Sequence, residues 1–148
     1  MKRFIRQGPN NTTSANITID FGAASGQIAR VLDPEVYNLR IESARVVLKN
    51  ENTLIVLDLV EVETGARVAL QPMWVQGPNA GAGQLAIENQ HLIAQLLNLA
   101  GKPTKGSVGD LIPELAGLTF VARLVLSTDR RTGRTFNAIA EIFTDGGA

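Results

Sequence analysis

The sequence predicts a mainly β domain that carries one or two helices. Five segments show either the alternation of apolar and polar residues or the β-branched run that is typical of strands. One segment between the third and the fourth of these has instead the 3.6-residue period of an amphipathic helix. The chain has 148 residues, of which 45% are hydrophobic, and this length suits one domain with a sizeable core.

The first three strands are expected in the segment that follows Pro34. Val36–Leu48 alternates apolar and polar residues, and the turn Lys49–Asn52 (KNEN) leads from it into the nearly continuous apolar run Thr53–Val62. The tripeptide Glu63–Gly65 is typical of a hairpin turn and is followed by Arg67–Gln76. We therefore expect three consecutive antiparallel strands.

The period changes after the glycine-rich loop GPNAGAG. Gln84–Ala100 carries an apolar stripe, and Gly101 and Pro103 are expected to end this helix. The stripe comprises Leu85, Leu92, Leu96 and Leu99, and it is widened by Ile93 and Leu97. A single helical turn is expected within Val108–Leu115, since Pro113 forbids a longer helix.

Two strands end the domain. They are expected at Leu118–Ser127 and Arg134–Phe143, on either side of the turn Asp129–Gly133 (DRRTG).

The chain is thereby divided into three parts. Residues 1–34 form an arm or edge strand, with strand-like alternation only at Ile17–Phe21. Residues 35–143 form the domain, and residues 144–148 form a short flexible tail.

The order of three strands, a helix and two strands is that of the OB-fold. This fold is a five-stranded Greek-key barrel whose open face and inter-strand loops bind single-stranded oligonucleotides. The main helix then lies between strands 3 and 4. A small α+β sandwich has the same number of elements and stays an alternative.

Composition argues against several function classes. Lys and Arg total 14, as do Asp and Glu, so the formal charge is zero and any polyanion must be held by a local patch. The absence of cysteine excludes disulfides, thiol catalysis and Cys-ligated metals. No apolar run has the length of a membrane span, and the N-terminus lacks the apolar region of a signal peptide. We expect a soluble, cytoplasmic protein without a membrane partner.

The inventory of catalytic and ligating residues favours a protein that is not an enzyme and needs no cofactor or metal. His91 is the only histidine and is expected on the solvent face of the helix. Glu61 and Glu63 point to one side of a strand, where solubilising charges at a hairpin are more common than a metal site. Asp58 interrupts an apolar strand, so we expect a salt bridge to an arginine of a neighbouring strand.

Two compact cationic segments stand out against the neutral total. Arg130, Arg131 and Arg134 lie in one turn, and Lys2, Arg3 and Arg6 surround Phe4 and Ile5 near the N-terminus. In an OB-fold the turn between the last two strands closes over a bound strand, and guanidinium groups there can pair with phosphates or stack on bases. A solubilising hairpin tip is the alternative.

Further candidate contacts lie on the strands and the other turn. Lys49 occupies the turn between strands 1 and 2, whereas Arg40, Arg67 and Arg123 lie on the polar sides of three strands. These arginines either converge into a phosphate track or pair across strands with Glu42, Asp58 and Glu61. Candidate stacking platforms are Tyr37, Phe136 and Trp74, although we expect Trp74 to lie in the core because Pro72 can turn it inward.

The sequence resembles the phage-encoded OB-fold single-stranded DNA-binding proteins. The resemblance covers about residues 35–143 and is most specific in TGRTFNAIAEI, where Gly133, Phe136, Asn137 and Ile139 match the closing hairpin of that family. It implies sequence-independent coating of single-stranded DNA during phage DNA replication or recombination, in the host cytoplasm. Many such proteins recruit partners through an acidic C-terminal tail, which we do not expect here, since Asp145 is the one acidic residue among the last five given.

Two other readings stay open. One is a structural or assembly protein, in which a neutral β-barrel packs against copies of itself as a homo-oligomer. The other is an RNA-binding OB module, because RNA and DNA single strands use the same groove.

Overall fold

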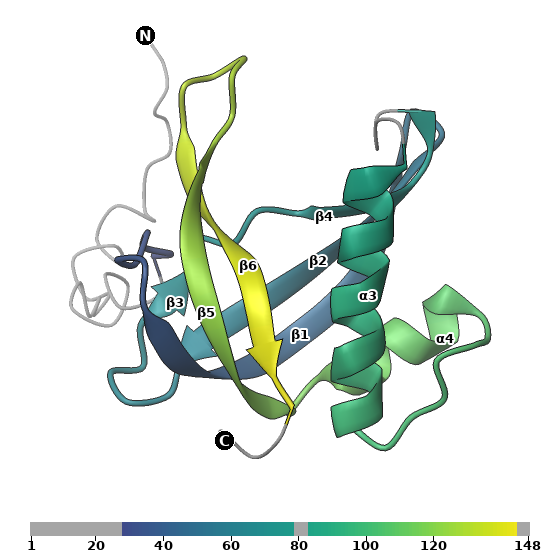
Figure 1. Cartoon of the computed structure of the whole chain (residues 1–148), viewed down its shortest axis with the longest axis horizontal. Helices are drawn as coiled ribbons and strands as arrows, with labels where there is room; N and C mark the ends of the chain where they lie inside the picture. The colour runs from purple at the N-terminus through teal and green to yellow at the C-terminus, as the bar shows by residue number, and fades with distance from the viewer. Residues whose placement is uncertain (1–27, 79–82, 145–148) are drawn as a thin grey trace, which may run out of the picture.

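The computed structural model describes residues 28–78 and 83–144. Within these residues the fold is mainly β: six strands form one open antiparallel sheet that is accompanied by helical segments (Figure 1). In chain order, the elements are β1 (Val36–Lys49), β2 (Asn52–Glu61), β3 (Arg67–Val68), β4 (Met73–Gln76), α3 (Gln84–Leu99), α4 (Val108–Leu111), the 3-10 helix η2 (Ile112–Leu115), β5 (Thr119–Thr128) and β6 (Thr135–Phe143). The predicted strands at Ile17–Phe21 and the basic segment around Arg3 lie outside the described residues.

The long strand β1 organises the sheet. The strand order is β3-β2-β1-β5-β6, and β4 also pairs with β2. β1 pairs with β2 from Leu39 to Lys49 but with β5 only from Val36 to Arg40. Figure 1 accordingly shows the β5–β6 hairpin crossing the β1–β2 hairpin at a steep angle.

The predicted third strand, Arg67–Gln76, is wrong as a continuous element. It divides into β3 and β4, because Pro72 has no N–H to donate and the residues before it pair elsewhere. Asn137 of β6 donates its backbone N–H to the Ala69 carbonyl (2.8 Å) and accepts the Gln71 N–H (2.8 Å). A single parallel bridge between Leu70 and Asn137 thus joins the β3–β4 connection to β6.

The N-terminal part of the described chain enters beside this junction. Arg30 forms a parallel bridge with Val68, donating its N–H to the Arg67 carbonyl and accepting that of Ala69, each at 2.8 Å. This part of the chain is therefore hydrogen-bonded to the edge strand β3 through Arg30 and does not form a free arm.

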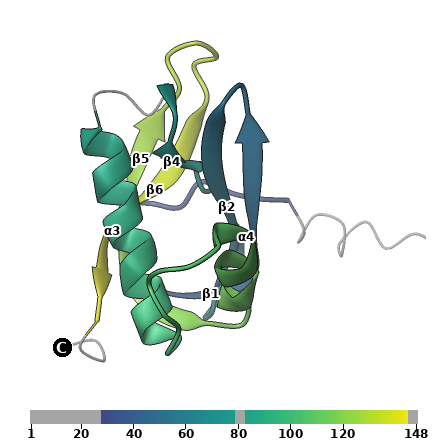
Figure 2. The same ribbon diagram turned by 90° about the vertical axis from the view of Figure 1, so that its right-hand side faces the viewer.

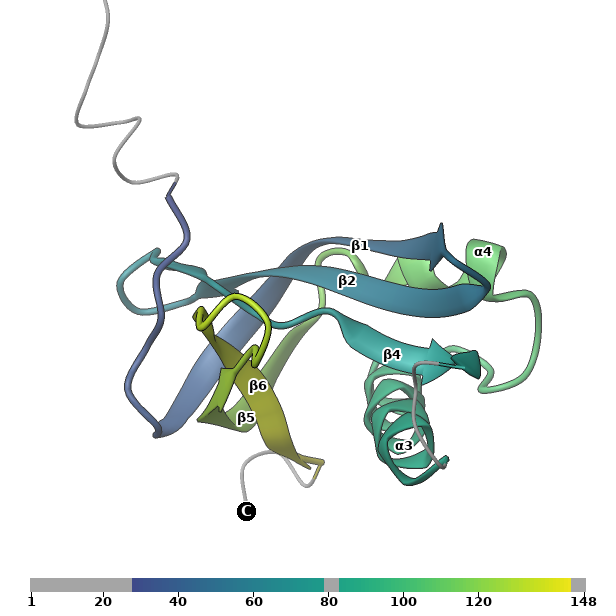
Figure 3. The ribbon, with the colours of Figure 1, turned by 90° about the horizontal axis from the view of Figure 1, so that it is seen from above.

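The core lies between the inner face of the sheet, α3 and η2. Figures 2 and 3 show α3 lying beside β4, where the side-chain amides of Asn89 and Gln90 donate to the carbonyls of Trp74 (2.9 Å) and Val75 (2.6 Å). The predicted helix is confirmed, but its apolar stripe is shorter than expected at both ends, because Leu85 is 48% exposed and Leu99 is 37% exposed. Buried residues of α3 are Ala86, Leu92, Ile93, Leu96 and Leu97. No helix in the described ranges is long and apolar enough to cross a membrane.

Candidate nucleic-acid interface

The turn between β5 and β6 holds three arginines in a defined conformation. Gly133 has a φ of 74° and donates its N–H to the Asp129 carbonyl at 2.7 Å, while the Asp129 N–H donates to the Arg134 carbonyl at 2.8 Å. Arg130, Arg131 and Arg134 are all exposed. Figure 1 shows this hairpin tip standing clear of the rest of the sheet. The predicted turn is therefore confirmed, and its arginines are accessible from solvent.

The positive charge of this turn is not neutralised by the rest of the described chain. None of its guanidinium groups forms an ion pair with a carboxylate of residues 28–78 or 83–144. The nearby Asp129 carboxylate instead accepts the backbone N–H of Arg131 at 2.8 Å. The Arg134 guanidinium lies 5.1 Å from the centre of the half-buried Phe136 ring, a cation–π distance. The turn thus combines free guanidinium groups with an aromatic ring.

The outer face of the sheet brings two more predicted residues together. Arg40 of β1 and Arg67 of β3 are both register partners of Val60, so they lie on either side of β2 and on the same face. The Arg40 Nε is 2.7 Å from the Glu42 Oε2, an ion pair within one strand rather than across two. Arg67 has no ion pair among the described residues.

Arg123 and Lys49 differ in how much of their charge is available. The Arg123 Nη2 lies 2.8 Å from the Glu141 Oε1 on β6, so its partner is none of the three acids considered from the sequence. Lys49 is exposed at the β1–β2 turn and has no ion pair within the described residues. The predicted turn Lys49–Asn52 is confirmed, and its central residues Asn50 and Glu51 have φ of 51° and 68°, as in two-residue hairpin loops.

Trp74 is half-buried, so the prediction that it lies in the core is wrong. Its neighbours Met73 and Val75 take the inward positions of β4, each 6% exposed, and strand alternation turns the indole to the outer face. There it is the register partner of the buried Leu54. Trp74 is therefore available as an aromatic contact on the same face as Arg67.

Tyr37 is a less accessible aromatic residue. Its ring packs against the core, and its hydroxyl donates to the Asp33 carbonyl at 2.7 Å. Burial, and then the nearby carboxylates of Glu35, Asp33 and Glu61, raise the pKa of this phenol above its usual value.

The acids singled out from the sequence have structural partners. Asp58 forms the predicted salt bridge, to the Arg45 Nη1 at 3.0 Å. Glu61 is 5% exposed, so describing it as a solubilising charge is wrong: it accepts the Glu63 N–H at 3.0 Å and the Thr64 hydroxyl at 2.5 Å, and so holds the β2–β3 turn. Within the ranges described, no three acidic or histidine side chains gather as metal ligands.

Arg45 is the contact candidate that sequence reasoning missed. A bulge between Ile41 and Ser43 inserts one residue into β1 and shifts the alternation, so that Ala44 points into the core and Arg45 points outward. The sequence did contain a signal of this bulge, because unbroken alternation along β1 would place Arg45 on the inner face of the sheet.

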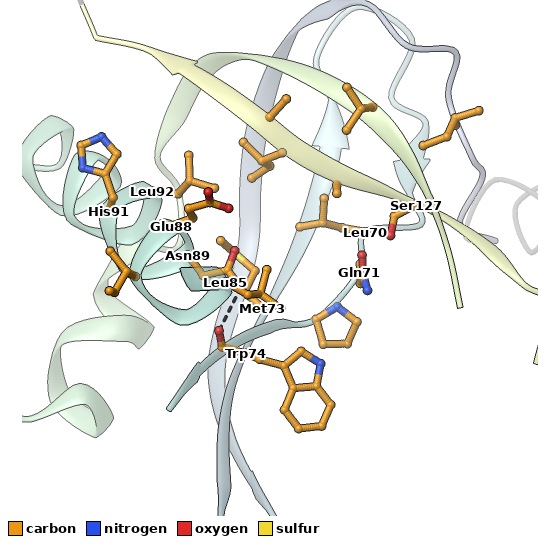
Figure 4. Close-up of a pocket in the computed structure, with 17 residues that line it drawn as sticks. Leu70, Gln71, Met73, Trp74, Leu85, Glu88, Asn89, His91, Leu92 and Ser127 are labelled. Carbon is orange, nitrogen blue, oxygen red and sulfur yellow. Dashed lines mark hydrogen bonds between the residues drawn. The ribbon is translucent and has the colours of Figure 1, made fainter. Parts of the chain in front are cut away.

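A pocket of about 720 Å³ opens beside Trp74 (Figure 4). The β3–β4 connection, the first half of α3, and β5 and β6 line it, whereas the indole extends away from α3. Glu88 and His91 are the titratable lining residues, and His91 is exposed as predicted. Among the described residues the lining contains no lysine or arginine, so those residues offer nothing to neutralise a phosphate.

No protein-family model matches the chain, and a search of curated proteins found no match either. The functional inference therefore rests on the arginines, the aromatic rings and their arrangement on the outer face.

Proposed function

We propose that the chain is an OB-fold protein that binds single-stranded DNA without sequence preference, in the manner expected for phage DNA replication or recombination. The fold assignment is supported by the bridge between Leu70 and Asn137. A five-stranded barrel closes where the ends of its sheet meet, and this bridge joins the connection that follows β3 to β6, the strand at the other end of the sheet order.

The observation that carries the functional proposal is the β5–β6 turn, whose arginines form no ion pair among the described residues and whose Arg134 lies over the Phe136 ring. Arg40, Arg45, Lys102 and Arg123 all have carboxylate partners, whereas the arginines of the β5–β6 turn have none among the described residues. Guanidinium groups bind phosphate oxygens, and bases stack on guanidinium planes and aromatic rings. Bases are free to stack in this way in a single strand but not in a duplex, so the turn favours single strands.

Fluorescence anisotropy with labelled oligo-dT, oligo-U and duplex DNA at two salt concentrations tests the proposal. If about four phosphates are neutralised, the slope of log K against log salt is about −3. Oligo-dT is expected to bind more tightly than the duplex, and the comparison with oligo-U decides between DNA and RNA. Equal affinity for oligo-dT and duplex, or no binding at low salt, would reject single-strand binding.

Replacing Arg130, Arg131 and Arg134 together by Ala is expected to weaken binding to oligo-dT at least about tenfold. The melting temperature should change little, because exposed turn charges contribute little to stability. Lys105→Ala is the control, since it removes an exposed cation of the loop after α3 that forms no ion pair with residues 28–78 or 83–144. An affinity of the triple variant within about twofold of the parent would leave the turn as a solubilising tip.

Trp74 provides a signal for the same titration, because it is the only tryptophan. A base that stacks on the indole should quench its fluorescence, and Trp74→Ala should lose about 1 to 3 kcal/mol of binding. Unchanged fluorescence at saturating oligo-dT would remove Trp74 from the interface.

Assembly into homo-oligomers is the second candidate function. The observation that favours it is the exposure of Leu85, Ile87 and Leu126 (48%, 62% and 50%) around the pocket beside Trp74. A formal charge of zero lets copies approach without net repulsion. A stable oligomer in sedimentation velocity that does not bind oligo-dT would favour this function over DNA binding.

A further inference from the structure

Two arginines on the outer face of β1 are held by carboxylates of the same face. The Arg40 Nε lies 2.7 Å from the Glu42 Oε2, and the Arg45 Nη1 lies 3.0 Å from the Asp58 Oδ2. The Ser43 hydroxyl donates a second hydrogen bond to the same Asp58 oxygen. The guanidinium groups are therefore already oriented before any ligand arrives.

These arginines belong to the surface that carries Arg67 and Trp74. Arg40 lies beside Val60, whose other register partner is Arg67, and the bulge in β1 returns Arg45 to the outer face. Farther along the same face, Val47 is the partner of Leu54, and Leu54 is the partner of Trp74. The arginines thus lie next to an apolar and aromatic strip on one face, the combination that single-strand binders use to hold phosphates and bases.

Both ion pairs are open to exchange. The Arg40 and Glu42 side chains are 43% and 37% exposed, and those of Arg45 and Asp58 are 58% and 41% exposed. Exposed ion pairs contribute little to stability, and a phosphate, like a carboxylate, can accept two parallel hydrogen bonds from one guanidinium group. Glu61 differs, because it is buried and bonded to its own turn.

We infer that Arg40 and Arg45 are further phosphate contacts for the proposed single-stranded DNA, and that Glu42 and Asp58 limit its affinity by occupying them in the free protein. This inference rests on the proposed function. On binding, each carboxylate gives up its guanidinium group to a phosphate and returns to water. The exchange attenuates binding, so a strand held at the β5–β6 turn is released from this face more readily than from a face of free cations.

The test uses the full chain and oligo-dT. Asp58→Asn keeps an oxygen that can accept the Ser43 hydroxyl but removes the charge that holds Arg45. We expect the affinity of this variant for oligo-dT to rise about two- to fivefold at low salt, because binding no longer has to break the exposed ion pair between Arg45 and Asp58. Glu42→Gln should give a gain of similar size through Arg40.

Two controls separate this exchange from a general gain of positive charge. Glu114→Gln removes the carboxylate 3.4 Å from the Lys102 Nζ, on the segment after α3, and adds the same unit of charge. Its affinity should stay within about twofold of the parent. In an Arg45→Gln background, Asp58→Asn should bring no gain, because the guanidinium group that it frees is absent. Thermal melts of each variant establish that folding is intact.

The outcomes distinguish this inference from the proposed function. A parent protein that binds oligo-dT while Asp58→Asn and Glu42→Gln leave its affinity unchanged would overturn the inference and leave single-strand binding in place. An equal gain in Glu114→Gln, or a gain that survives Arg45→Gln, would also overturn it. Absence of binding by the parent and by every variant would overturn the proposed function and this inference with it.

Discussion

Asn137→Ala is expected to destabilise the fold strongly, because this side chain bonds to a segment 105 residues away. Asn137 is fully buried. Its Oδ1 accepts the Leu32 N–H at 2.7 Å, and its Nδ2 donates to the Leu32 carbonyl at 2.9 Å and to the Val125 carbonyl at 3.4 Å. One amide thereby fastens the chain before β1 to the last strand of the sheet.

The magnitude follows from the two short bonds. Each contributes about 1 kcal/mol net, and a buried group that is left without a partner costs about 1 to 3 kcal/mol. The alanine variant loses both bonds and leaves the Leu32 N–H and C=O to be satisfied by water at a part-buried position. We therefore expect a loss of about 3 kcal/mol, or about 6 to 12 °C in melting temperature for a chain of this size.

Urea denaturation followed by Trp74 fluorescence and far-UV circular dichroism measures this loss. Asn98→Ala is the matched control: Asn98 is exposed near the end of α3, and its replacement should change stability by less than about 0.5 kcal/mol. Asn137→Asp should be at least as destabilising as Asn137→Ala, because its second oxygen would face the Leu32 carbonyl. A stability of Asn137→Ala within about 0.5 kcal/mol of the parent, at an unchanged m-value, would refute this account.

Two further predictions concern a turn glycine and a tyrosine. Gly77→Ala should destabilise by about 2 kcal/mol or more in urea denaturation, because at φ 114° its Cβ would lie 2.6 Å from the Asn52 Cα and the Glu51 carbonyl oxygen. Gly65→Ala, whose Cβ meets nothing within 4 Å at φ 74°, should cost only about 1 kcal/mol, and equal losses would contradict the steric argument. The raised pKa of Tyr37 means that its neutral phenol is favoured in the folded state, so the associated stability is present below the unfolded value of 10.0 and is lost as pH rises through the folded pKa. Tyr37→Phe should lessen the fall in melting temperature above about pH 10, and a parallel fall in both proteins would contradict this assignment.

The sequence by itself determined the four long strands and the main helix, whereas the predicted third strand is divided and the single turn expected within Val108–Leu115 is instead α4 followed by η2. Alternation, β-branched runs and the helical period are local properties, so β1, β2, β5, β6 and α3 lie where these patterns predict them. The two turns around Asn50 and Gly133 were predictable for the same reason, since positive φ favours a few residue types. The salt bridge of Asp58 to an arginine was predicted because a carboxylate within an apolar strand must face solvent, a hydrogen-bond partner or a cation.

Only the tertiary structure decided which side chains share a face and which pair. The bulge in β1 moves Arg45 to the outer face, and local alternation cannot locate an inserted residue because the partner strand defines it. The division of the third strand depends on Asn137, which lies more than sixty residues later and takes the hydrogen bonds of Ala69 and Gln71. That division sets the side of β4 on which Trp74 lies. Register between distant strands also paired Arg123 with Glu141, because cross-strand neighbours follow from the alignment of whole strands and not from their spacing in the chain.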